Sequence, residues 1–537
     1  MNIVQRKLKS INFQRNREWK RKRKYLKKTL ILYFKIIIII VTLTIVTLLS
    51  ANSSTSLRSQ DNDFNLSSVI LINSNSEFKY LAEQEGWVGN GTPSNPYSVT
   101  NLTINASGRR IIDINNVDLY FQIKNCTLIG AGVSFFNVKN GMLINNSIID
   151  EPEKRGIYMQ HCVNFLIKMN FFSRITLINV EKGEISNNTI TDENGGYRIN
   201  LDECSDIQIK FNEINELISP YIYIPPNHQL KLPSDSIYTE GISIKASSEI
   251  TIIRNNIYCC NNGITSERSS DLIIANNLIY GIESNGILLT HTNLSTIEEN
   301  NVSYAFFGIE VSESDNNDIL NNSFGFIFCD CIFIDTSKQN TISKNELFGS
   351  QPWFVAEGIY LSSSQNNVCI DNYIHNCWIG IYLDYSSTNI IFKNTITDSY
   401  EDGMYIHLSS DENKVSENKV YRNRYGIFID ESNSNTILNN EVCENLLGIY
   451  LTRAHYNSII GNNISDNHQG GIRLQSSNNN EISGNWFQLN RGKDFYQNDS
   501  TGNILSNYPN EPTPSWMYSL LLISFSVITV IRRRRRV

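Results

Sequence analysis

The sequence predicts an all-β fold: a parallel β-helix with coils of 22–23 residues, flanked by a hydrophobic helix at each end of the chain. Three observations predict it. A Gly-Ile-x-Leu/Ile motif recurs, an asparagine follows it in phase, and the intervening stretches alternate apolar and polar residues without a helical period. The motif begins at Gly241, Gly263, Gly286, Gly308, Cys331 (in place of glycine), Gly358, Gly380, Gly403, Gly426, Gly448 and Gly471. Successive starts are 22 or 23 residues apart, apart from one spacing of 27.

The second marker of the repeat is an asparagine fourteen residues after each start, and only Glu417, which stands beside Asn418, breaks this row. The row consists of Asn277, Asn300, Asn322, Asn345, Asn372, Asn394, Asn440, Asn462 and Asn485. A unit this short cannot bury its own apolar face, so it must stack on its neighbours. A leucine-rich repeat would need Leu at most framework positions and usually a helical return, whereas Ile and Val dominate here. We therefore expect Ile and Leu inside, ladders of stacked Asn side chains, and Asn and Gly in left-handed turns.

The amino-terminal region divides into three predicted segments. Residues 1–28 form a basic tail, which positive-inside logic keeps in the cytoplasm. Residues 29–50 form an apolar transmembrane helix or signal-anchor in which Lys35 reaches toward the interface, or alternatively a signal peptide cut near Ala51. Residues 51–85 form a linker and an amino-terminal cap.

The β-helix is predicted over 86–503, followed by a Pro-containing linker over 504–515. Residues 516–531 are apolar and form a predicted transmembrane or sorting helix, and the basic tail 532–537 follows it. Since both basic ends then lie inside, we expect a protein of the cell membrane whose bulk is extracellular. Candidate N-x-S/T glycosylation sites fit that location. Apart from its two basic ends the chain is about 24 charges negative (28 basic against 52 acidic residues), which speaks against a nucleic-acid partner.

The chain resembles a known family from its opening Gly86-Trp-Val-Gly-Asn-Gly-Thr-Pro onward, through N-N-x-I and G-I-x-L coils to about Asn503. It is similar to right-handed parallel β-helix proteins of the NosD-like, carbohydrate-binding and sugar-hydrolase (CASH) type. The resemblance implies a single-stranded right-handed β-helix, and relatives include lyases, hydrolases, epimerases and surface proteins. The carboxyl-terminal segment resembles the sorting and anchor segments of archaeal surface proteins. Some relatives carry a copper-binding label, but 7 His and 6 Met without a clustered motif do not support copper here.

Two outward-facing rows follow from the frame, because side chains alternate along a strand. Taking each glycine position as zero, the +2 row is aromatic and consists of Phe333, Tyr360, Tyr382, Tyr405, Phe428 and Tyr450. The +4 row beside it is polar and consists of Asp335, Ser362, Asp384, His407, Asp430 and Thr452. Sugars bind such faces through ring stacking and hydrogen bonds, so we expect the aromatic row and Asp335 to bind a ligand. Alternatively, the rings stack on one another and only rigidify the sheet.

The most promising catalytic set is Asp384, His407 and Asp430 on successive coils, with Glu401 and Asp402 one strand-start away. Paired carboxylates with a histidine can serve as general acid and base. We expect no metal centre and no cofactor, while Ca²⁺ among the acids stays open, as does the oligomeric state. The favoured function is non-catalytic binding of an extracellular polysaccharide or glycoconjugate by a protein held to the membrane through both termini. The alternatives are a polysaccharide lyase or glycoside hydrolase, and a structural envelope rod or adhesin.

Overall fold

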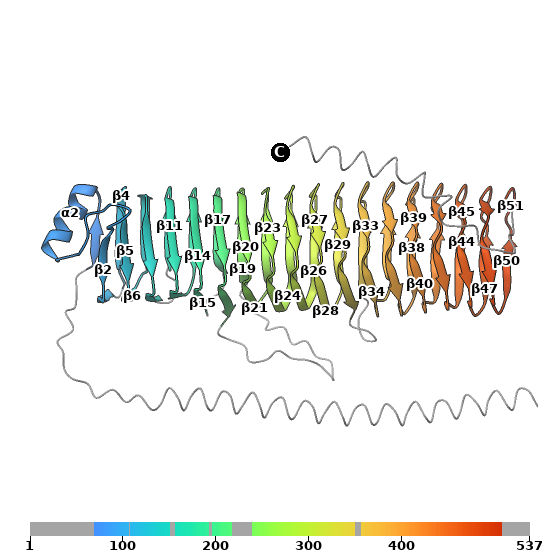
Figure 1. Cartoon of the computed structure of the whole chain (residues 1–537), viewed down its shortest axis with the longest axis horizontal. Coiled ribbons are helices and arrows are strands. Elements are labelled where there is room, and N and C mark those ends of the chain that lie inside the picture. Colours follow the sequence, from blue (N-terminus) through green and yellow to red (C-terminus); the bar gives the residue numbers. More distant parts are fainter. Residues whose placement is uncertain are drawn as a thin grey trace, which may run out of the picture. The chain divides into compact units, whose positions relative to one another are not determined.

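The described chain is a stack of short parallel strands. The computed structural model describes residues 69–106, 108–150, 156–192, 196–216, 239–349 and 356–506. They form an all-β parallel solenoid of about 16 turns, which confirms the predicted fold class (Figure 1). Both predicted flanking helices, 29–50 and 516–531, lie outside the described residues. Among the residues described, no helix has the length and apolar character needed to cross a membrane.

Each coil contributes three strands, and each strand pairs in parallel with its counterpart on the next coil. One representative coil contains β38 (Asp402–His407), β39 (Lys414–Ser416) and β40 (Lys419–Tyr421). We call the surfaces built by these strands and their counterparts the first, second and third faces. The second face runs from β2 (Tyr97–Thr100) to β51 (Ile504–Ser506) and the third from β3 (Thr103–Ala106) to β49 (Trp486–Gln488).

The first face carries the predicted site. Its strands are β1 (Ile70–Ile72), β4 (Ile112–Val117), β7 (Val133–Val138), β10 (Ile157–Gln160), β13 (Ile175–Ile178), β16 (Gly196–Asp202), β19 (Thr239–Lys245), β22 (Asn262–Glu267), β24 (Leu278–Thr290), β26 (Asn301–Ser312), β29 (Asp330–Asp335), β32 (Glu357–Ser362), β35 (Ile381–Asp384), β38, β41 (Tyr425–Asp430), β44 (Leu447–Thr452), β47 (Gly470–Gln475) and β50 (Lys493–Asn498). The long strands β24 and β26 also continue onto the third face.

A short helix covers the first coils. α2 (Asn75–Gln84) begins after Ser74, whose hydroxyl accepts a hydrogen bond from the backbone N–H of Glu77. Its Phe78 is fully buried and packs against the ring of Phe121 at 5.1 Å between centroids. The helix therefore closes the apolar interior at this end of the solenoid (Figure 1).

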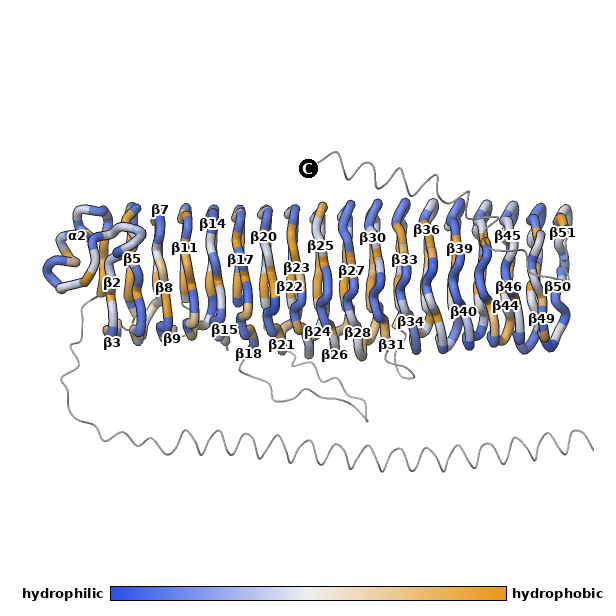
Figure 2. Tube along the Cα trace, viewed as in Figure 1, coloured by the Kyte–Doolittle hydropathy of each residue, from blue (hydrophilic) through white to orange (hydrophobic). Residues whose placement is uncertain are grey.

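The interior is a column of aliphatic side chains. In β32, Ile359 and Leu361 are completely buried, whereas Tyr360 between them is only partly covered. This alternation matches the inward and outward positions that the sequence predicts. Figure 2 shows apolar segments recurring from coil to coil along the whole stack. The cysteines are free thiols, and seven of the ten are buried.

The repeated glycines have a different role from the predicted one. None of the repeat glycines from Gly241 to Gly471 has a positive φ, so they are not left-handed turn residues. A Cβ at Gly403 would instead lie 2.4 Å from Val420 Cγ1 and 2.7 Å from the carbonyl oxygen of Gly426 on the next coil. Close approach of neighbouring coils, and not turn geometry, therefore requires glycine here.

The asparagine ladder is present and longer than predicted. Each buried Asn accepts hydrogen bonds, from both the backbone N–H and the side-chain amide of its neighbour; Asn394 and Asn418 are one such pair, 2.8 and 3.0 Å apart. The predicted break at Glu417 is wrong, because Asn418 occupies the ladder and Glu417 is the left-handed residue before it, with φ 55°. A second ladder lies at another corner of the coils and includes Asn340, Asn367 and Asn389.

Candidate functional site

The two predicted rows lie on the outer surface of the first face. The register pairs Tyr360 with Tyr382, and Tyr382 with Tyr405, along the aromatic row. The same strand pairings place Asp384 opposite His407 and His407 opposite Asp430. The structure therefore brings together all the residues of each row in the order that the repeat predicts.

The aromatic rings contact one another through their faces. Centroids of consecutive rings from Phe333 to Tyr450 are 4.7–5.1 Å apart, with interplanar angles of 4–29°. The guanidinium of Arg473 lies 5.4 Å from the centroid of the last ring, Tyr450. Stacking of this kind covers ring faces, so the row offers mainly ring edges and tyrosine hydroxyls to a ligand.

His407 is the centre of the polar row. Its Nδ1 lies 3.1 Å from the hydroxyl of Tyr382 and 3.4 Å from Oδ1 of Asp384, while its Nε2 lies 4.0 Å from Oδ2 of Asp430. The imidazole also stacks on Tyr405, with 4.8 Å between centroids. Stacking on Tyr405 and the hydrogen bond between Nδ1 and the Tyr382 hydroxyl hold the ring between the two carboxylates.

A cation completes this arrangement. The guanidinium of Arg453 donates to both carboxylate oxygens of Asp430, at 2.7 and 2.9 Å, and to Glu431 at 2.6 Å. Asp430 is thus held by an ion pair that Asp384 lacks. The two carboxylates on either side of His407 are therefore in different electrostatic settings.

Burial raises the pKa values of acids and phenols on this face. Partial burial raises the pKa of Asp384, although nearby His407 and Tyr360 oppose the shift. Burial also raises the pKa of Asp430, against the opposing effect of Arg453. The phenol of Tyr360 has its pKa raised to about 12 by burial and by the charge of Asp384. The groups of this face consequently retain protons that exposed residues would release, a feature suited to hydrogen bonding and to acid–base chemistry.

Apart from Asp402, which the sequence analysis named beside the catalytic set, a third row of acids was missed by the sequence reasoning. The residues one position before the motif start include Glu240, Asp330, Glu357 and Asp402 on the first face. Burial and the neighbouring charge of Glu401 raise the pKa of Asp402 to about 7. Strict alternation turns this position inward, and Glu240, Asp330 and Asp402 are indeed buried, at 5%, 3% and 6% exposed.

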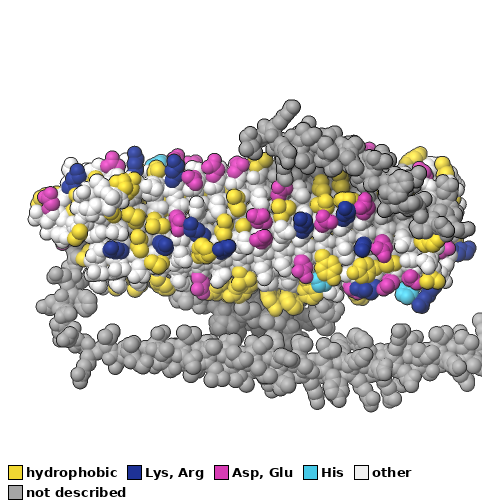
Figure 3. Space-filling view, viewed as in Figure 1, with side chains coloured by type: hydrophobic (Ala, Val, Ile, Leu, Met, Phe, Trp, Pro, Cys, Tyr) yellow, Lys and Arg dark blue, Asp and Glu magenta, His cyan; other side chains and the backbone are white. Residues whose placement is uncertain are grey.

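A second aromatic group was also missed, on the third face and its corner with the first. Tyr304 and Phe326 stack at 4.9 Å, and Phe326 meets Phe348 edge to face at 5.7 Å. Phe326 is 46% exposed and Tyr373 42% exposed. Figure 3 shows hydrophobic side chains gathered along the lower edge of the view, where the third-face strands lie. Their spacing of one coil was the sequence signal that could have revealed this group.

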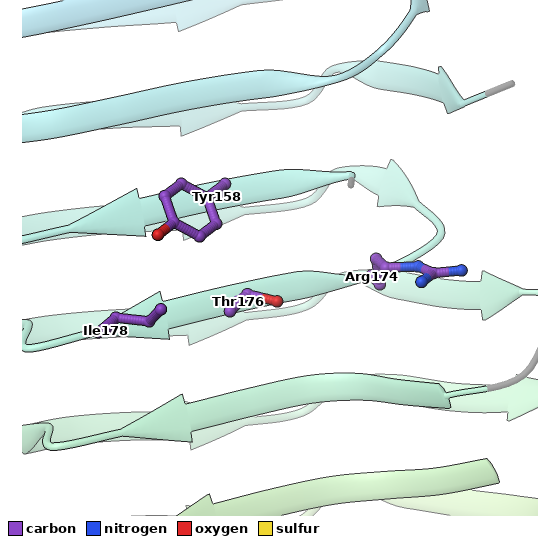
Figure 4. A pocket seen from close by; sticks show the side chains of 4 residues that line it. All are labelled: Tyr158, Arg174, Thr176 and Ile178. Carbon is purple, nitrogen blue, oxygen red and sulfur yellow. The ribbon is translucent and has the colours of Figure 1, made fainter. Parts of the chain in front are cut away.

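One shallow hollow lies elsewhere on the first face. Tyr158, Arg174, Thr176 and Ile178 line it, and its volume is about 350 Å³ (Figure 4). It involves β10 and β13, far along the stack from His407. No cluster of three or more His, Cys, Asp or Glu side chains able to hold a metal occurs in the part of the chain that the structure describes.

The comparisons with known proteins identify one family and several solved structures of low sequence identity. The model of the family described as periplasmic copper-binding protein (NosD) matches residues 175–354 and 350–510. Among solved structures, a mutant of the periplasmic alginate epimerase AlgG is 14% identical, with 81% of this chain and 83% of that chain covered and a TM-score of 0.26. PfbA, a surface adhesin of Streptococcus pneumoniae, is 14% identical, with 67% and 83% covered and a TM-score of 0.30. None of the curated proteins matches the sequence.

The family match extends well beyond the first-face strands that carry the polar row. Its two segments together span residues 175–510, which is more than half of the 537 residues. They include the repeat from Gly241 to Gly471 and therefore rest on the same pattern that builds the solenoid. The chain belongs to the NosD family.

Proposed function

We propose that this protein is an extracytoplasmic binding protein for a polysaccharide or glycoconjugate, which lies along the first face and is held by hydrogen bonds from the polar row. The observation that carries the proposal is the convergence of the Tyr382 hydroxyl, the His407 imidazole and the carboxylates of Asp384 and Asp430 on one partly exposed strip. Donors and acceptors at one-coil intervals match a ligand with many hydroxyl groups.

Contact through ring faces is not part of this proposal. The stacked rings leave edges and hydroxyls for a ligand, so the aromatic row contributes a rigid support and the hydroxyls of Tyr360, Tyr382 and Tyr405. Rigid support lowers the entropic cost of binding, because the polar groups are already in place before the ligand arrives.

The sequence and the family description support this extracytoplasmic location. The family description places its members in the periplasm, and the apolar segments 29–50 and 516–531 with their basic flanks supply attachment to the membrane. The bulk of the chain then faces outward, in the style of archaeal surface proteins. Protease added to intact cells should digest the solenoid while leaving a membrane-bound fragment; a chain wholly protected in intact cells would contradict this orientation.

Copper binding is not part of the proposed function. The family description names copper, but the described residues contain no group of three or more His, Cys, Asp or Glu side chains able to hold a metal, and the polar row offers one imidazole between hard carboxylates. Copper sites are built from several imidazole, thiolate or thioether ligands. The residues described here do not fit that ion.

A panel of immobilised polysaccharides tests the proposal. The full-length protein in detergent should be retained by at least one polysaccharide, and Asp384→Asn or His407→Ala should weaken retention about tenfold or more, since each removes a hydrogen-bonding group from the strip. His291→Ala is the matched control, because His291 also lies 3.0 Å from a carboxylate, Glu313, outside the polar row. Equal loss in the control, or no loss in either variant, would contradict the proposal.

Acid–base catalysis on a sugar is the second candidate. The specific observation is that His407 lies between two carboxylates whose pKa values are both raised by burial. In glycoside cleavage or β-elimination, one such group would give a proton and another would take one. The same panel distinguishes the candidates, because release of reducing or unsaturated ends that Asp384→Asn abolishes would establish catalysis. Retention without product would leave binding alone.

A further inference from the structure

Two aromatic side chains form a pair at the corner where the third face turns into the first. Tyr400 lies between β37 (Thr395–Thr397) and β38, and Trp378 lies at the same corner of the preceding coil, between β34 (Tyr373–His375) and β35. Their rings stack, with 4.7 Å between centroids and an interplanar angle of 23°. Tyr400 is 61% exposed, whereas Trp378 is partly buried. We call these two residues the corner pair.

One ring face of Tyr400 is open. Trp378 covers the other face, and no further ring stacks on Tyr400 among the described residues. The next coil has Arg424 at this corner, and its guanidinium lies over Tyr425, 4.8 Å from the ring centroid. In the aromatic row, by contrast, Tyr405 has a stacked ring on both sides. The corner pair therefore offers the ring-face contact that the aromatic row lacks.

Backbone hydrogen bonds hold the corner pair in position. The N–H of Tyr400 donates to the carbonyl of Cys377, and the N–H of Glu401 donates to the carbonyl of Trp378, both at 2.9 Å. Stacking on Trp378 then orients the phenol ring itself. Because the ring is in place before a ligand arrives, binding to it loses little conformational entropy.

Charged side chains lie beside the open ring. The guanidinium of Arg424 donates to the carboxylate of Glu401, the residue after Tyr400. Sugar-binding sites combine an apolar platform with a few polar groups that contact hydroxyls. Protein-binding sites are instead marked by large contiguous apolar patches. A single open ring next to a carboxylate and a guanidinium therefore favours a sugar as its ligand.

The corner pair and the polar row lie near opposite ends of the same strand. β38 begins at Asp402, two residues after Tyr400, and ends at His407. At about 3.3 Å per residue, Asp402 and His407 are about 17 Å apart. A polysaccharide that contacts both ends must cross the first face in the strand direction, over Tyr405. We propose that one sugar ring stacks on the open face of Tyr400 and that the same polysaccharide chain reaches His407, an inference that rests on the proposed function.

Tyr456 provides a matched control. It is 63% exposed, and no ring stacks on it among the described residues. It lies at a different corner, between β44 and β45 (Ser458–Ile460), where the first face turns into the second. Tyr456→Ala therefore removes an equally exposed phenol without touching the corner pair.

Titration of the full-length protein in detergent with a polysaccharide retained in the panel tests the stacking contact. We expect Tyr400→Ala to weaken binding about threefold to tenfold, and Tyr400→Phe and Tyr456→Ala to stay within about twofold of the wild type. Tyr400→Phe keeps the ring, so it separates stacking from a role of the hydroxyl. It also guards against a loss of folding in the alanine variant.

Fragments of the same polysaccharide test the direction of the bound chain. Affinity of the wild type should rise steeply once a fragment spans about 17 Å, because one ligand then contacts both ends of β38. Tyr400→Ala should lack this rise. A rise of equal size in Tyr400→Ala would contradict the crossing.

The outcomes separate this inference from the proposed function. Wild-type affinity in Tyr400→Ala, together with weakened binding in His407→Ala, would overturn the inference and leave the proposed function standing. Equal losses in Tyr400→Ala and Tyr400→Phe would also overturn it, because the hydroxyl and not the ring face would then hold the ligand. A wild type that no polysaccharide retains would overturn both.

Discussion

Replacing Asn394 by alanine tests the hydrogen-bonded ladder that joins consecutive coils. Oδ1 of Asn394 accepts from the backbone N–H and the side-chain amide of Asn372, at 3.0 and 2.9 Å. Its own amide donates to the carbonyl of Cys369 at 2.9 Å and to Oδ1 of Asn418 at 3.0 Å. All of these side chains are essentially inaccessible to water, so no solvent replaces the lost bonds.

The expected loss of stability follows from the buried polar groups that lose their hydrogen-bond partners. Alanine deprives the Asn372 N–H and the Cys369 carbonyl of these partners, whereas the Asn372 amide keeps its bond to the Ile342 carbonyl. Each buried unsatisfied group costs about 1–3 kcal/mol, which gives about 2–6 kcal/mol in total. Because the stability of a solenoid is a sum of terms between neighbouring repeats, the loss should stay close to the substituted coil.

Hydrogen exchange measures that local loss directly. Amides of β34 (Tyr373–His375) and β37 (Thr395–Thr397) should exchange at least about 30-fold faster in Asn394→Ala, at 1.4 kcal/mol per tenfold change. Asn463→Ala, at an exposed position outside the ladder, is the control and should change exchange little. Exchange in Asn394→Ala within about threefold of the control would refute the ladder as a source of stability.

Three further predictions follow from the packing and the burial of the first face. Gly403→Ala should lower the midpoint of thermal unfolding, because its Cβ would lie 2.4 Å from a methyl group of Val420. Gly325→Ala is the control and should leave the midpoint unchanged, because its Cβ would have no contact closer than 4.0 Å. Equal effects of the two substitutions would contradict the packing argument. Tyr405→Ala should cost about 1–3 kcal/mol by removing its stacking contacts with Tyr382 and Phe428, besides the one with His407. Tyr405→Phe should cost much less in urea unfolding, and equal stability of the two variants would refute the stack. Folded Asp402 keeps its proton up to about pH 7, whereas the unfolded carboxyl releases it near pH 4. The free energy of unfolding of the wild type should therefore decrease as the pH rises from about 4 to about 7. Asp402→Asn should escape that fall and gain up to about 4 kcal/mol relative to the wild type at pH 8, and a constant difference from pH 4 to pH 8 would contradict the shift.

The repeat made the fold and the two outward rows predictable. A spacing of 22–23 residues with two markers in phase determines which positions share a row, and the register of Tyr382 with Tyr405 then follows. The all-β parallel solenoid and the NosD family are confirmed. The binding and catalytic roles of Phe333, Tyr360, Asp335, Asp384 and the other row members remain predictions.

Other features depend on distances that a repeat pattern does not contain. The repeat spacing predicted that the rings lie in one row, but not whether their faces contact each other or a sugar. Parallel strands are about 4.8 Å apart, which is also the distance between stacked rings, so the rings stack on one another. The role of the glycines was assigned to turns because positive φ is their commonest use, whereas here close approach between coils requires them. The row of Asp330 and Glu357 was missed because alternation turns their position inward, where apolar side chains are the usual occupants.

Hydrogen exchange in the presence of a retained polysaccharide tests most directly whether the polar row is the ligand surface. Saturating ligand should slow exchange in β35, β38 and β41 on the first face, around Asp384, His407 and Asp430. Exchange in β36 (Ile390–Phe392), β39 and β42 (Thr436–Leu438) on the second face of the same coils should stay unchanged. Protection confined to the second face, or to the exposed aromatic group on the third, would contradict the proposed site.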